Sequence, residues 1–540
     1  KGLREGDLLK EISYEEFQAG GALRRTTLST AEEMQAFLEV PRFDLAVRFI
    51  FERNGADVPG FQSYTHWREL AAQVIAVDRE WALWTPSGFY DASFNGNRLF
   101  GWQINRGLER QPDFYRADRF QAVLERPDLI RRLLPTGSVQ QAAQVAGKQK
   151  IGFGDVLANS LALQPIVRIL APLDDQAVAG HETEIRAEVL LAQGQQLASA
   201  KAYVSGVAAA QPRQLRRESL SNGQQRIELS WQATLPSDKN LQIQVYCSTR
   251  EKLVAADSRQ LARAAALSPR RKPKLYLLAA GISEYRDSRV PDLQLGAANA
   301  VGFMETLLPA AAELYDVQPI VLTDTSVTPA VWRSTLRQLE SQFRQVQADD
   351  LILLFVSGHG LLDTNNDYYF VTANARYSDL VRKNFRDCLS FAELASWSDA
   401  PCRKIAILDT CHSGAIQPLD SQQLKQAVRY LQSDLILTLT ASEGNQLAAE
   451  YRGAQASLFT SALQQSLREP QDGNGNGLLD WPELVRQVSD RVTRQSLAGS
   501  VPQFPTAGPK DLLESLELPL AGGDGVTTPR PALVSHRNAP

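Results

Sequence analysis

Residues 351–360 read Leu-Ile-Leu-Leu-Phe-Val-Ser-Gly-His-Gly, and residues 405–414 read Ile-Ala-Ile-Leu-Asp-Thr-Cys-His-Ser-Gly. Each stretch begins as a continuous apolar run. The first ends with an imidazole between two glycines, and the second ends with a thiol followed by His-Ser-Gly. Continuous apolar runs are typical of strands buried on both faces of a parallel sheet. In such sheets, ligands bind beyond the carboxyl ends of the strands. The sequence therefore predicts that His359 and Cys411 face one crevice.

The two stretches lie in a region, 274–520, that alternates apolar runs with helical patterns. Further apolar runs occur at residues 275–280, 320–322 and 435–439. This alternation predicts one α/β domain with a mainly parallel sheet flanked by helices.

Cys411 and His359 carry the chemistry that this edge of the sheet suggests. A thiol reacts as its thiolate, and a neighbouring imidazolium lowers its pKa from about 8.5. Only histidine has an unperturbed pKa near neutrality, so His359 is suited to stabilise the thiolate and protonate a leaving amine. The alternative is that Cys411 only fills the core; we interpret the adjacent His412 as structural.

Residues 357–360 (Ser-Gly-His-Gly) and 409–414 (Asp-Thr-Cys-His-Ser-Gly) resemble the catalytic motifs of the caspase and metacaspase superfamily of cysteine endopeptidases. Residues 281–285 and 368–371 resemble family segments that flank these motifs. The Asp-x-Cys form, without a QACxG-like sequence, is more similar to metacaspases and their prokaryotic relatives than to animal caspases. The resemblance therefore implies a bacterial caspase-like protein with N-terminal accessory domains.

The resemblance also implies an oxyanion hole. In the family, backbone amides hold the oxyanion, and here they would belong to Gly360 and Cys411. We expect Gly358, Gly360 and Gly414 to allow the backbone torsions that bring those amides to the substrate carbonyl.

Asp409 would line the pocket for the residue that precedes the scissile bond, as in metacaspases. A buried carboxylate there favours Arg or Lys through charge-assisted hydrogen bonds. Ser357 would line the same pocket, and Asn299 stands where many relatives have a second aspartate. The alternative is that Asp409 only caps its own loop.

Residues 472–483 match the twelve-position EF-hand loop, which binds Ca²⁺ through oxygen ligands. The candidate ligands are Asp472, Asn474, Asn476, the Leu478 carbonyl, Asp480 and Glu483. The simpler alternative is a glycine-rich turn in which Asp480 and Glu483 start a helix as a capping box. Calcium dependence in metacaspases is attributed to a different acidic cluster, and the chemistry itself requires no cofactor.

The rest of the chain predicts β-rich accessory modules. Turn-rich alternating strands over 161–256 suit an immunoglobulin-like antiparallel sandwich. Residues 2–7 contain a GLxxGD turn that resembles a PDZ-type module, and a strand is expected at 43–50; the alternative is a turn followed by an ordinary hairpin. The predicted segments are 1–58 (PDZ-like remnant), 59–160 (aromatic-rich connector), 161–256 (sandwich), 257–273 (basic linker, read as a solvated hinge), 274–520 (peptidase domain) and 521–540 (flexible tail).

Composition limits the partners. The chain has 540 residues, with 57 basic and 61 acidic ones, so no global field attracts nucleic acid or anionic membranes. Apolar runs of about six residues are too short to span a bilayer. Four scattered cysteines favour a reducing, cytoplasmic setting over a disulfide framework. Because the sequence starts at Lys1, we expect residues upstream of it.

We therefore predict a cysteine endopeptidase that cleaves protein substrates after Arg or Lys, answers to a regulatory signal, and processes itself. Candidate processing sites are Lys425, Arg429, Arg270, Arg271 and Lys272. The N-terminal modules would bind a regulatory protein. The alternative is a catalytically silent scaffold that uses its PDZ-like and sandwich modules. Nucleic-acid binding through residues 259–274 is disfavoured because that basic run lacks interleaved aromatics.

Overall fold

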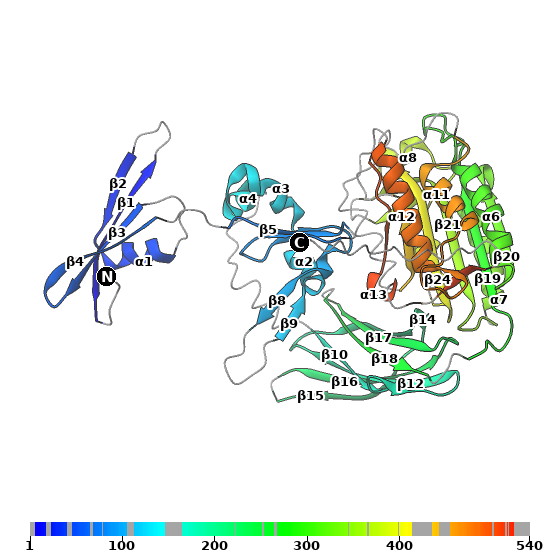
Figure 1. Ribbon diagram of the computed structural model, residues 1–540, viewed down its shortest axis with the longest axis horizontal. Coiled ribbons are helices and arrows are strands. Elements are labelled where there is room, and N and C mark those ends of the chain that lie inside the picture. Colours follow the sequence, from blue (N-terminus) through cyan, green and yellow to red (C-terminus); the bar gives the residue numbers. More distant parts are fainter. Residues whose placement is uncertain are drawn as a thin grey trace, which may run out of the picture. The chain divides into compact units, whose positions relative to one another are not determined.

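The chain divides into two compact units in a computed structural model (Figure 1). The first consists of residues 1–74, 83–91 and 126–153, and the second of residues 75–82, 92–125 and 154–540. The structure describes residues 6–522, except for 18–22, 40–45, 65–68, 78, 105–112, 146–164, 222, 251–252, 264–266, 344, 364–366, 398, 413–434, 442–453, 499–501, 514–515 and 517.

The N-terminal part of the first unit is a four-stranded antiparallel sheet in the order β2-β1-β3-β4, with one helix. Arg53 binds the Asp7 carboxylate of the predicted GLxxGD turn with two hydrogen bonds of 2.6 and 2.5 Å. The sheet runs past the predicted boundary at residue 58, so that boundary is wrong. The PDZ-type resemblance stays a prediction. The elements are β1 (Leu8–Phe17), β2 (Leu23–Leu28), α1 (Ala31–Glu39), β3 (Ala46–Arg53) and β4 (Ala56–Tyr64).

The predicted connector, 59–160, has the expected short strands and also helices that its aromatic clusters did not indicate. It is divided between the two units, so it is not one compact piece. Its aromatic residues do pack together: the rings of Trp102 and Phe120 meet edge to face at 5.2 Å. The elements are β5 (Ala72–Ile75), β6 (Trp81–Trp84), β7 (Tyr90–Ala92), η1 (Gly96–Arg98), β8 (Gly101–Ile104), β9 (Asp113–Arg116), η2 (Ala117–Phe120), α2 (Gln121–Leu124), α3 (Pro127–Thr136) and α4 (Val139–Val145).

The sandwich predicted from the alternating strands is present as two sheets, β10-β12-β16-β15 and β11-β18-β17-β13-β14. Their inward residues form one core, in which Trp231 is 1 % exposed. The strands are β10 (Ile166–Ala171), β11 (Gln176–Ala177), β12 (Glu182–Leu191), β13 (Leu197–Val204), β14 (Val207–Ala208), β15 (Arg213–Ser219), β16 (Gln225–Thr234), β17 (Asn240–Thr249) and β18 (Val254–Ala262).

The solvated basic hinge predicted for 257–273 is wrong in part. Strand β18 continues to Ala262, because its alternating residues pair with β17. Arg263 is buried, and its guanidinium donates to three backbone carbonyl groups, those of Gly180, Pro236 and Asp238. Arg271 binds the buried Asp350 carboxylate through two hydrogen bonds of 2.9 and 2.5 Å. The side chains of Arg263 and Arg271 therefore form hydrogen bonds within the protein, and this part of the segment is not a solvated hinge.

The α/β region has a sheet in the order β20-β19-β21-β24-β25-β27. The first five strands are parallel and β27 is antiparallel, which agrees with the mainly parallel sheet that we predicted. Strands β22 and β23 extend it beside the end of β21. The elements are β19 (Lys274–Gly281), α6 (Gly296–Ala311), β20 (Asp316–Thr323), η3 (Asp324–Ser326), α7 (Pro329–Phe343), β21 (Leu351–Leu362), β22 (Tyr368–Val371), α8 (Tyr377–Val381), β23 (Cys388–Ser390), α9 (Phe391–Leu394), β24 (Arg403–His412), β25 (Leu437–Thr440), α11 (Leu458–Arg468), β26 (Leu478–Asp480), α12 (Trp481–Ala498), β27 (Thr506–Gly508), α13 (Lys510–Leu513) and β28 (Pro519–Gly522).

Helices cover both faces of this sheet, which explains why its central strands are apolar at every position. Alternate residues of β21, such as Leu353 and Phe355, belong to a core shared with α6, α11 and α12 (Figure 1). The intervening residues, such as Leu354, belong to a second core with Trp332 of α7. All twelve residues of β21 are buried.

The sandwich and the α/β region, which belong to the same compact unit, share buried contacts. Arg403, at the start of β24, is 4 % exposed and forms an ion pair with Asp238 of the sandwich. Its Nε also donates to the Ser205 carbonyl at 3.2 Å. Burial lowers the pKa of Arg403 to about 10. Beside this pair, Ser237 donates twice to the Asp349 carboxylate, at 2.7 and 2.8 Å.

The predicted tail starts too early, because β28 ends at Gly522 and Ala521 is buried against the core. The remaining tail, 523–540, lies outside the described residues. Among the helices that the structure describes, none is long and apolar enough to cross a membrane.

Candidate active site

The pairing of β21 with β24 brings the predicted catalytic positions together. In this parallel register His359 lies opposite Cys411, and Ser357 lies opposite Asp409. Residues directly opposite each other in neighbouring strands share one face of the sheet. The predicted meeting of the His and Cys positions at the carboxyl end of the sheet is therefore present in the backbone. The side chain of Cys411 and the segment 413–434 lie outside the described residues.

The His359 imidazole is held in one orientation. Its Nε2 lies 2.8 Å from the Pro291 carbonyl oxygen, and its ring stacks on Tyr285 with 5.0 Å between centroids. A carbonyl oxygen only accepts hydrogen bonds, so Nε2 carries the proton and Nδ1 is the basic nitrogen of the neutral ring. Burial lowers the pKa of His359, although the Pro291 carbonyl and Asp292 act in the opposite direction.

This environment predicts how stability depends on pH. Because the pKa of folded His359 lies below its ordinary value of 6.5, the unfolded chain binds a proton there first as the pH falls. His359 therefore contributes a loss of stability as the pH decreases through 6.5. When the pH is lowered from 7.5 to 5.5, we expect the melting temperature of His359→Gln to fall less than that of the wild type, as measured by circular dichroism. Equal losses would contradict the burial argument.

Gly358 and Gly360 serve a different purpose from the one predicted. Neither has a positive φ, so the expectation of special torsions is wrong for these two. A Cβ on Gly358 would lie 2.9 Å from the Phe370 ring, and one on Gly360 would lie 2.7 Å from Tyr368. The glycines thus leave room for the aromatic rings of Phe370 and Tyr368 on β22. Gly414 lies outside the described residues.

The three predicted pocket residues form one buried hydrogen-bonded group. Asn299 Nδ2 donates to Ser357 Oγ and to Asp409 Oδ2, both at 3.1 Å. The same carboxylate oxygen accepts from Ser457 Oγ at 2.6 Å and from Thr460 Oγ1 at 2.7 Å. Asp409 therefore also holds the first turn of α11, where a negative charge is favourable. That contact gives Asp409 a structural role beside the predicted one.

The other cysteines are unsuited to be nucleophiles. Cys247, Cys388 and Cys402 are free thiols buried in the cores. Burial raises the pKa of each to about 12, so their thiolates are scarce near neutrality. Of the four cysteines in the sequence, Cys411 is the one that remains for the reaction.

The EF-hand-like loop is closed by its own hydrogen bonds. Glu483 accepts from the N–H groups of Gly473, Asn474 and Asp480 at 2.6–3.0 Å. Asp480 Oδ2 accepts from two amide groups, those of the Asn474 and Asn476 side chains. Within the described ranges, no three acidic, histidine or cysteine side chains converge as metal ligands. This arrangement suits the turn and helix start better than a metal cage, so no catalytic step is assigned to calcium.

Glu483 should stabilise the fold without any metal. Glu483→Ala leaves three backbone N–H groups without their acceptor, and of these the Asp480 N–H is buried, at a cost of about 1–3 kcal/mol. We expect a loss of about 2 kcal/mol or more in the free energy of unfolding, measured by urea denaturation in EDTA. The exposed Glu469, directly after α11, provides the control, since Glu469→Ala should cost under about 1 kcal/mol. A stable Glu483→Ala protein in EDTA would contradict the capping role.

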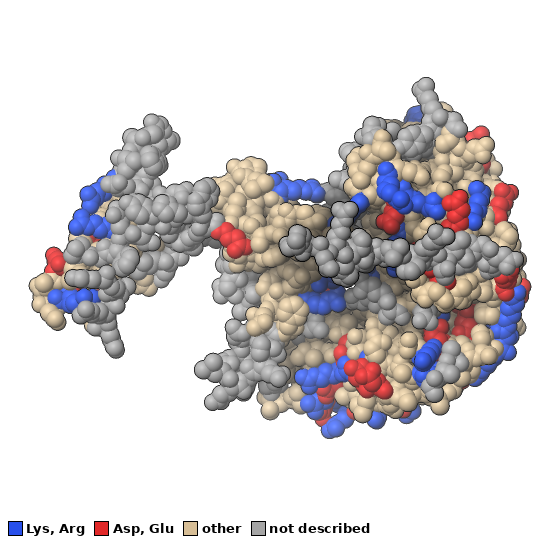
Figure 2. Space-filling view, viewed as in Figure 1, with Lys and Arg blue, Asp and Glu red and all other residues tan. Residues whose placement is uncertain are grey.

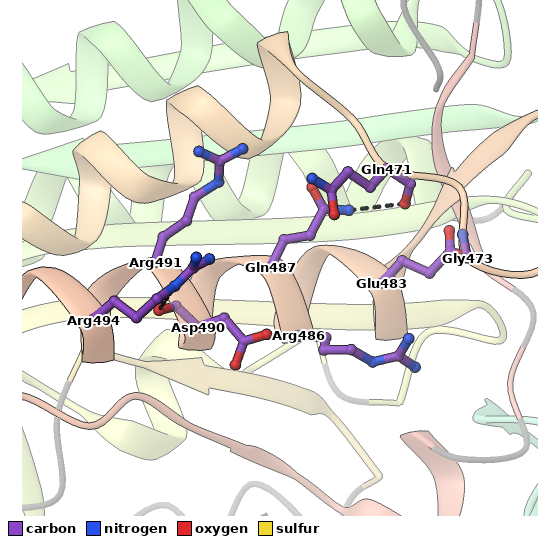
Figure 3. A pocket seen from close by; sticks show the side chains of 8 residues that line it. All are labelled: Gln471, Gly473, Glu483, Arg486, Gln487, Asp490, Arg491 and Arg494. Atoms are coloured by element: carbon purple, nitrogen blue, oxygen red, sulfur yellow. Dashed lines mark hydrogen bonds between the residues drawn. The ribbon is translucent and has the colours of Figure 1, made fainter. Parts of the chain in front are cut away.

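A cavity of about 310 Å³ runs along α12 and is lined in part by residues of the EF-hand-like loop (Figure 3). Gln487 Nε2 donates to the Gln471 carbonyl across one end of it at 2.9 Å. It is lined by Gln471, Gly473, Glu483, Arg486, Gln487, Asp490, Arg491 and Arg494. Elsewhere, acidic and basic side chains are interspersed on the face shown in Figure 2, which fits the small net charge.

Sequence reasoning missed four contributors to the site: Tyr285, Pro291, Ser457 and Thr460. Pro291 acts through its carbonyl oxygen, which no side-chain pattern reveals. Tyr285 lies in a segment quoted only for its resemblance to the family. The hydroxyl groups at the start of α11 are brought to Asp409 by tertiary packing, 48 and 51 residues along the chain.

Residues 283–513 match the family model of the caspase domain. The α/β region is therefore a caspase domain of the caspase and metacaspase family of cysteine peptidases. A comparison with curated protein sequences found no match.

Two solved structures have weak similarity to the chain. "Secreted serine protease VesC from Vibrio cholerae" is 9 % identical, with 47 % of this chain and 46 % of that chain covered and a TM-score of 0.16. "Tandem Ig repeats of Dlar" is 11 % identical, with 22 % and 60 % covered and a TM-score of 0.11. The chain thus spans about half the length of the first. Neither likeness supports an argument about function.

Proposed function

We propose that the protein is an active cysteine endopeptidase that cleaves protein substrates after Arg or Lys. The observation that carries the proposal is the register that sets His359 opposite Cys411, with His359 Nε2 fixed on the Pro291 carbonyl. That arrangement leaves Nδ1 as the base, as a thiol nucleophile requires.

The reaction follows in two steps. The Cys411 thiolate forms a bond to the scissile carbonyl carbon, while backbone amides such as those of Gly360 and Cys411 would stabilise the oxyanion. The C–N bond breaks, and the imidazolium of His359 gives its proton to the leaving amine. Water then attacks the thioester, with His359 taking its proton, and the new carboxyl terminus leaves the regenerated thiol.

The preference for basic residues rests on the Asp409 carboxylate. It is buried with Asn299 and Ser357 two residues before Cys411. A single buried carboxylate attracts a guanidinium or ammonium group and repels a carboxylate.

Fluorogenic peptides that differ only in Arg, Lys or Asp before the bond test this preference. We expect kcat/KM for Arg and Lys to exceed that for Asp by at least about 100-fold, or about 2.7 kcal/mol. The Cys411→Ala protein serves as the blank. A faster Asp peptide would overturn the assignment of Asp409, and no hydrolysis of any peptide by the wild type would overturn the proposed function.

The finer predictions extend this proposal. Self-processing would occur at Lys425 or Arg429, which lie outside the described residues, or near the exposed Arg270. Arg271 and Lys272 are weaker candidates, because their side chains bind Asp350 and the Ala312 carbonyl. A regulatory partner for the N-terminal modules, calcium binding and a cytoplasmic location stay predictions.

A further inference from the structure

Tyr285 occupies a gap in the ladder of the central strand. Strand β24 pairs with one edge of β21 as far as Gly360. On the other edge, β19 pairs as far as Ser357, and β22 begins to pair at Gly360. His359 lies in the gap between these two partners, and its backbone N–H donates to the Tyr285 hydroxyl at 3.1 Å. The hydroxyl thus takes the place of a strand at the catalytic histidine.

The same tyrosine also contacts the imidazole. Its ring stacks on that of His359 with an interplanar angle of 21°. Both residues are buried, with exposed fractions of 7 % for Tyr285 and 3 % for His359. The stack restricts the rotation of the imidazole and keeps water from one of its faces.

One short loop supplies both supports of the histidine. The Tyr285 N–H donates to Asp292 Oδ1 at 2.8 Å, next to Pro291, whose carbonyl accepts from His359 Nε2 at 2.8 Å. The loop is tied to the domain by further backbone bonds, such as that from Arg286 to Ala373 at 2.9 Å. Among the residues that the structure describes, His359 Nδ1 has no hydrogen-bond partner. The loop therefore fixes the ring while leaving Nδ1 to react.

We propose that Tyr285 is a positioning residue that fixes the orientation and the tautomer of His359. This inference rests on the proposed peptidase function. It predicts that Tyr285 affects the turnover step more than substrate binding, because its contacts are with His359 and its loop.

Two variants separate the contacts. Tyr285→Phe keeps the ring but removes the acceptor, and we expect kcat to fall about 5-fold to 10-fold, the effect of one hydrogen bond. Tyr285→Leu also removes the stack, and we expect kcat to fall about 100-fold or more, because misplacement of a catalytic group by about 1 Å has that effect. The KM of each variant should change less than about 2-fold, because the loss of even one contact with the substrate would change KM by more than that.

Nitrogen-15 spectra of the histidine rings give a readout that does not depend on peptidase activity. In wild type the His359 signals, assigned with His359→Gln, should show the Nε2-protonated tautomer and titrate below 6.5. In Tyr285→Leu the tautomers should mix and the titration should move toward 6.5. Tyr276→Phe, in the same core but at the start of β19, is the matched control and should change neither readout.

The outcomes are distinct. A kcat that is unchanged in Tyr285→Leu, or a rise in KM that accounts for the whole loss, would overturn the positioning role. Unchanged tautomer and titration of His359 would overturn it as well. If Tyr285→Leu fails to fold, Tyr285→Phe decides by its kcat and spectra. If wild type cleaves no peptide, the proposed function fails, while the spectra still decide what Tyr285 does to His359.

Discussion

Replacing Cys411 with alanine should reduce peptide hydrolysis by about 10⁴-fold or more, and His359→Ala should be nearly as severe. The nucleophile and its base act as one unit, so the loss of either removes the same step. The double variant should therefore be little worse than each single one. Hydrolysis of the basic fluorogenic peptide, measured at saturating substrate, gives these values.

The control for this prediction is the melting temperature. His359→Ala leaves a cavity beside Tyr285, so activity should be compared at a temperature where each variant is folded by circular dichroism. Loss of a general acid–base should lower kcat by about 100-fold or more. If His359→Ala kept more than about a tenth of the wild-type kcat, the loss would be too small and His359 would not be the base.

Replacing Asp238 with alanine should destabilise the unit formed by the sandwich and the caspase domain by about 3–5 kcal/mol. The change leaves the guanidinium of Arg403 buried without its ion-pair partner at the start of β24. Since β24 carries Asp409 and Cys411 at its other end, peptidase activity should disappear with the fold. Urea denaturation followed by tryptophan fluorescence measures the loss.

The matched control is the exposed pair of Lys201 and Asp399, 3.9 Å apart, which also joins the sandwich to the caspase domain. Asp399→Ala should cost less than about 1 kcal/mol. Combining Asp238→Ala with Arg403→Met should recover part of the stability, because the buried charge is gone. If Asp238→Ala unfolded at the wild-type urea concentration, the sandwich would be an accessory module in the sense first predicted, and not a structural part of the enzyme.

The central strands could be predicted because a strand that is buried on both faces is apolar at every position. The runs at 351–356 and 405–408 are apolar throughout. The strands themselves continue through the polar residues that follow, β21 to Leu362 and β24 to His412. The sequence predicted only that His359 and Cys411 face one crevice, whereas the order of the strands and the register of these two residues come from the structure. The site was thus found from two short stretches.

The other features depend on contacts that sequence patterns do not encode. Basic residues near a proline look like a solvated hinge. In the structure, however, Arg263 donates to backbone carbonyl groups and Arg271 binds Asp350. The glycines beside His359 suggested unusual torsions, whereas Gly358 and Gly360 make room for aromatic rings. The acceptor on Pro291 is a backbone atom, so its side chain gives no signal.

The most direct test of the account is the pH dependence of Cys411 alkylation by iodoacetamide, mapped by mass spectrometry. We predict that Cys411 in the wild type reacts with an apparent pKa well below about 8.5, the usual value for a thiol, and that His359→Ala returns it to about 8.5 or above. Cys247, Cys388 and Cys402 should remain unlabelled in the folded protein, since they are buried thiols with pKa values of about 12. The same Cys411 profile in both proteins would contradict the pairing of this thiol with His359.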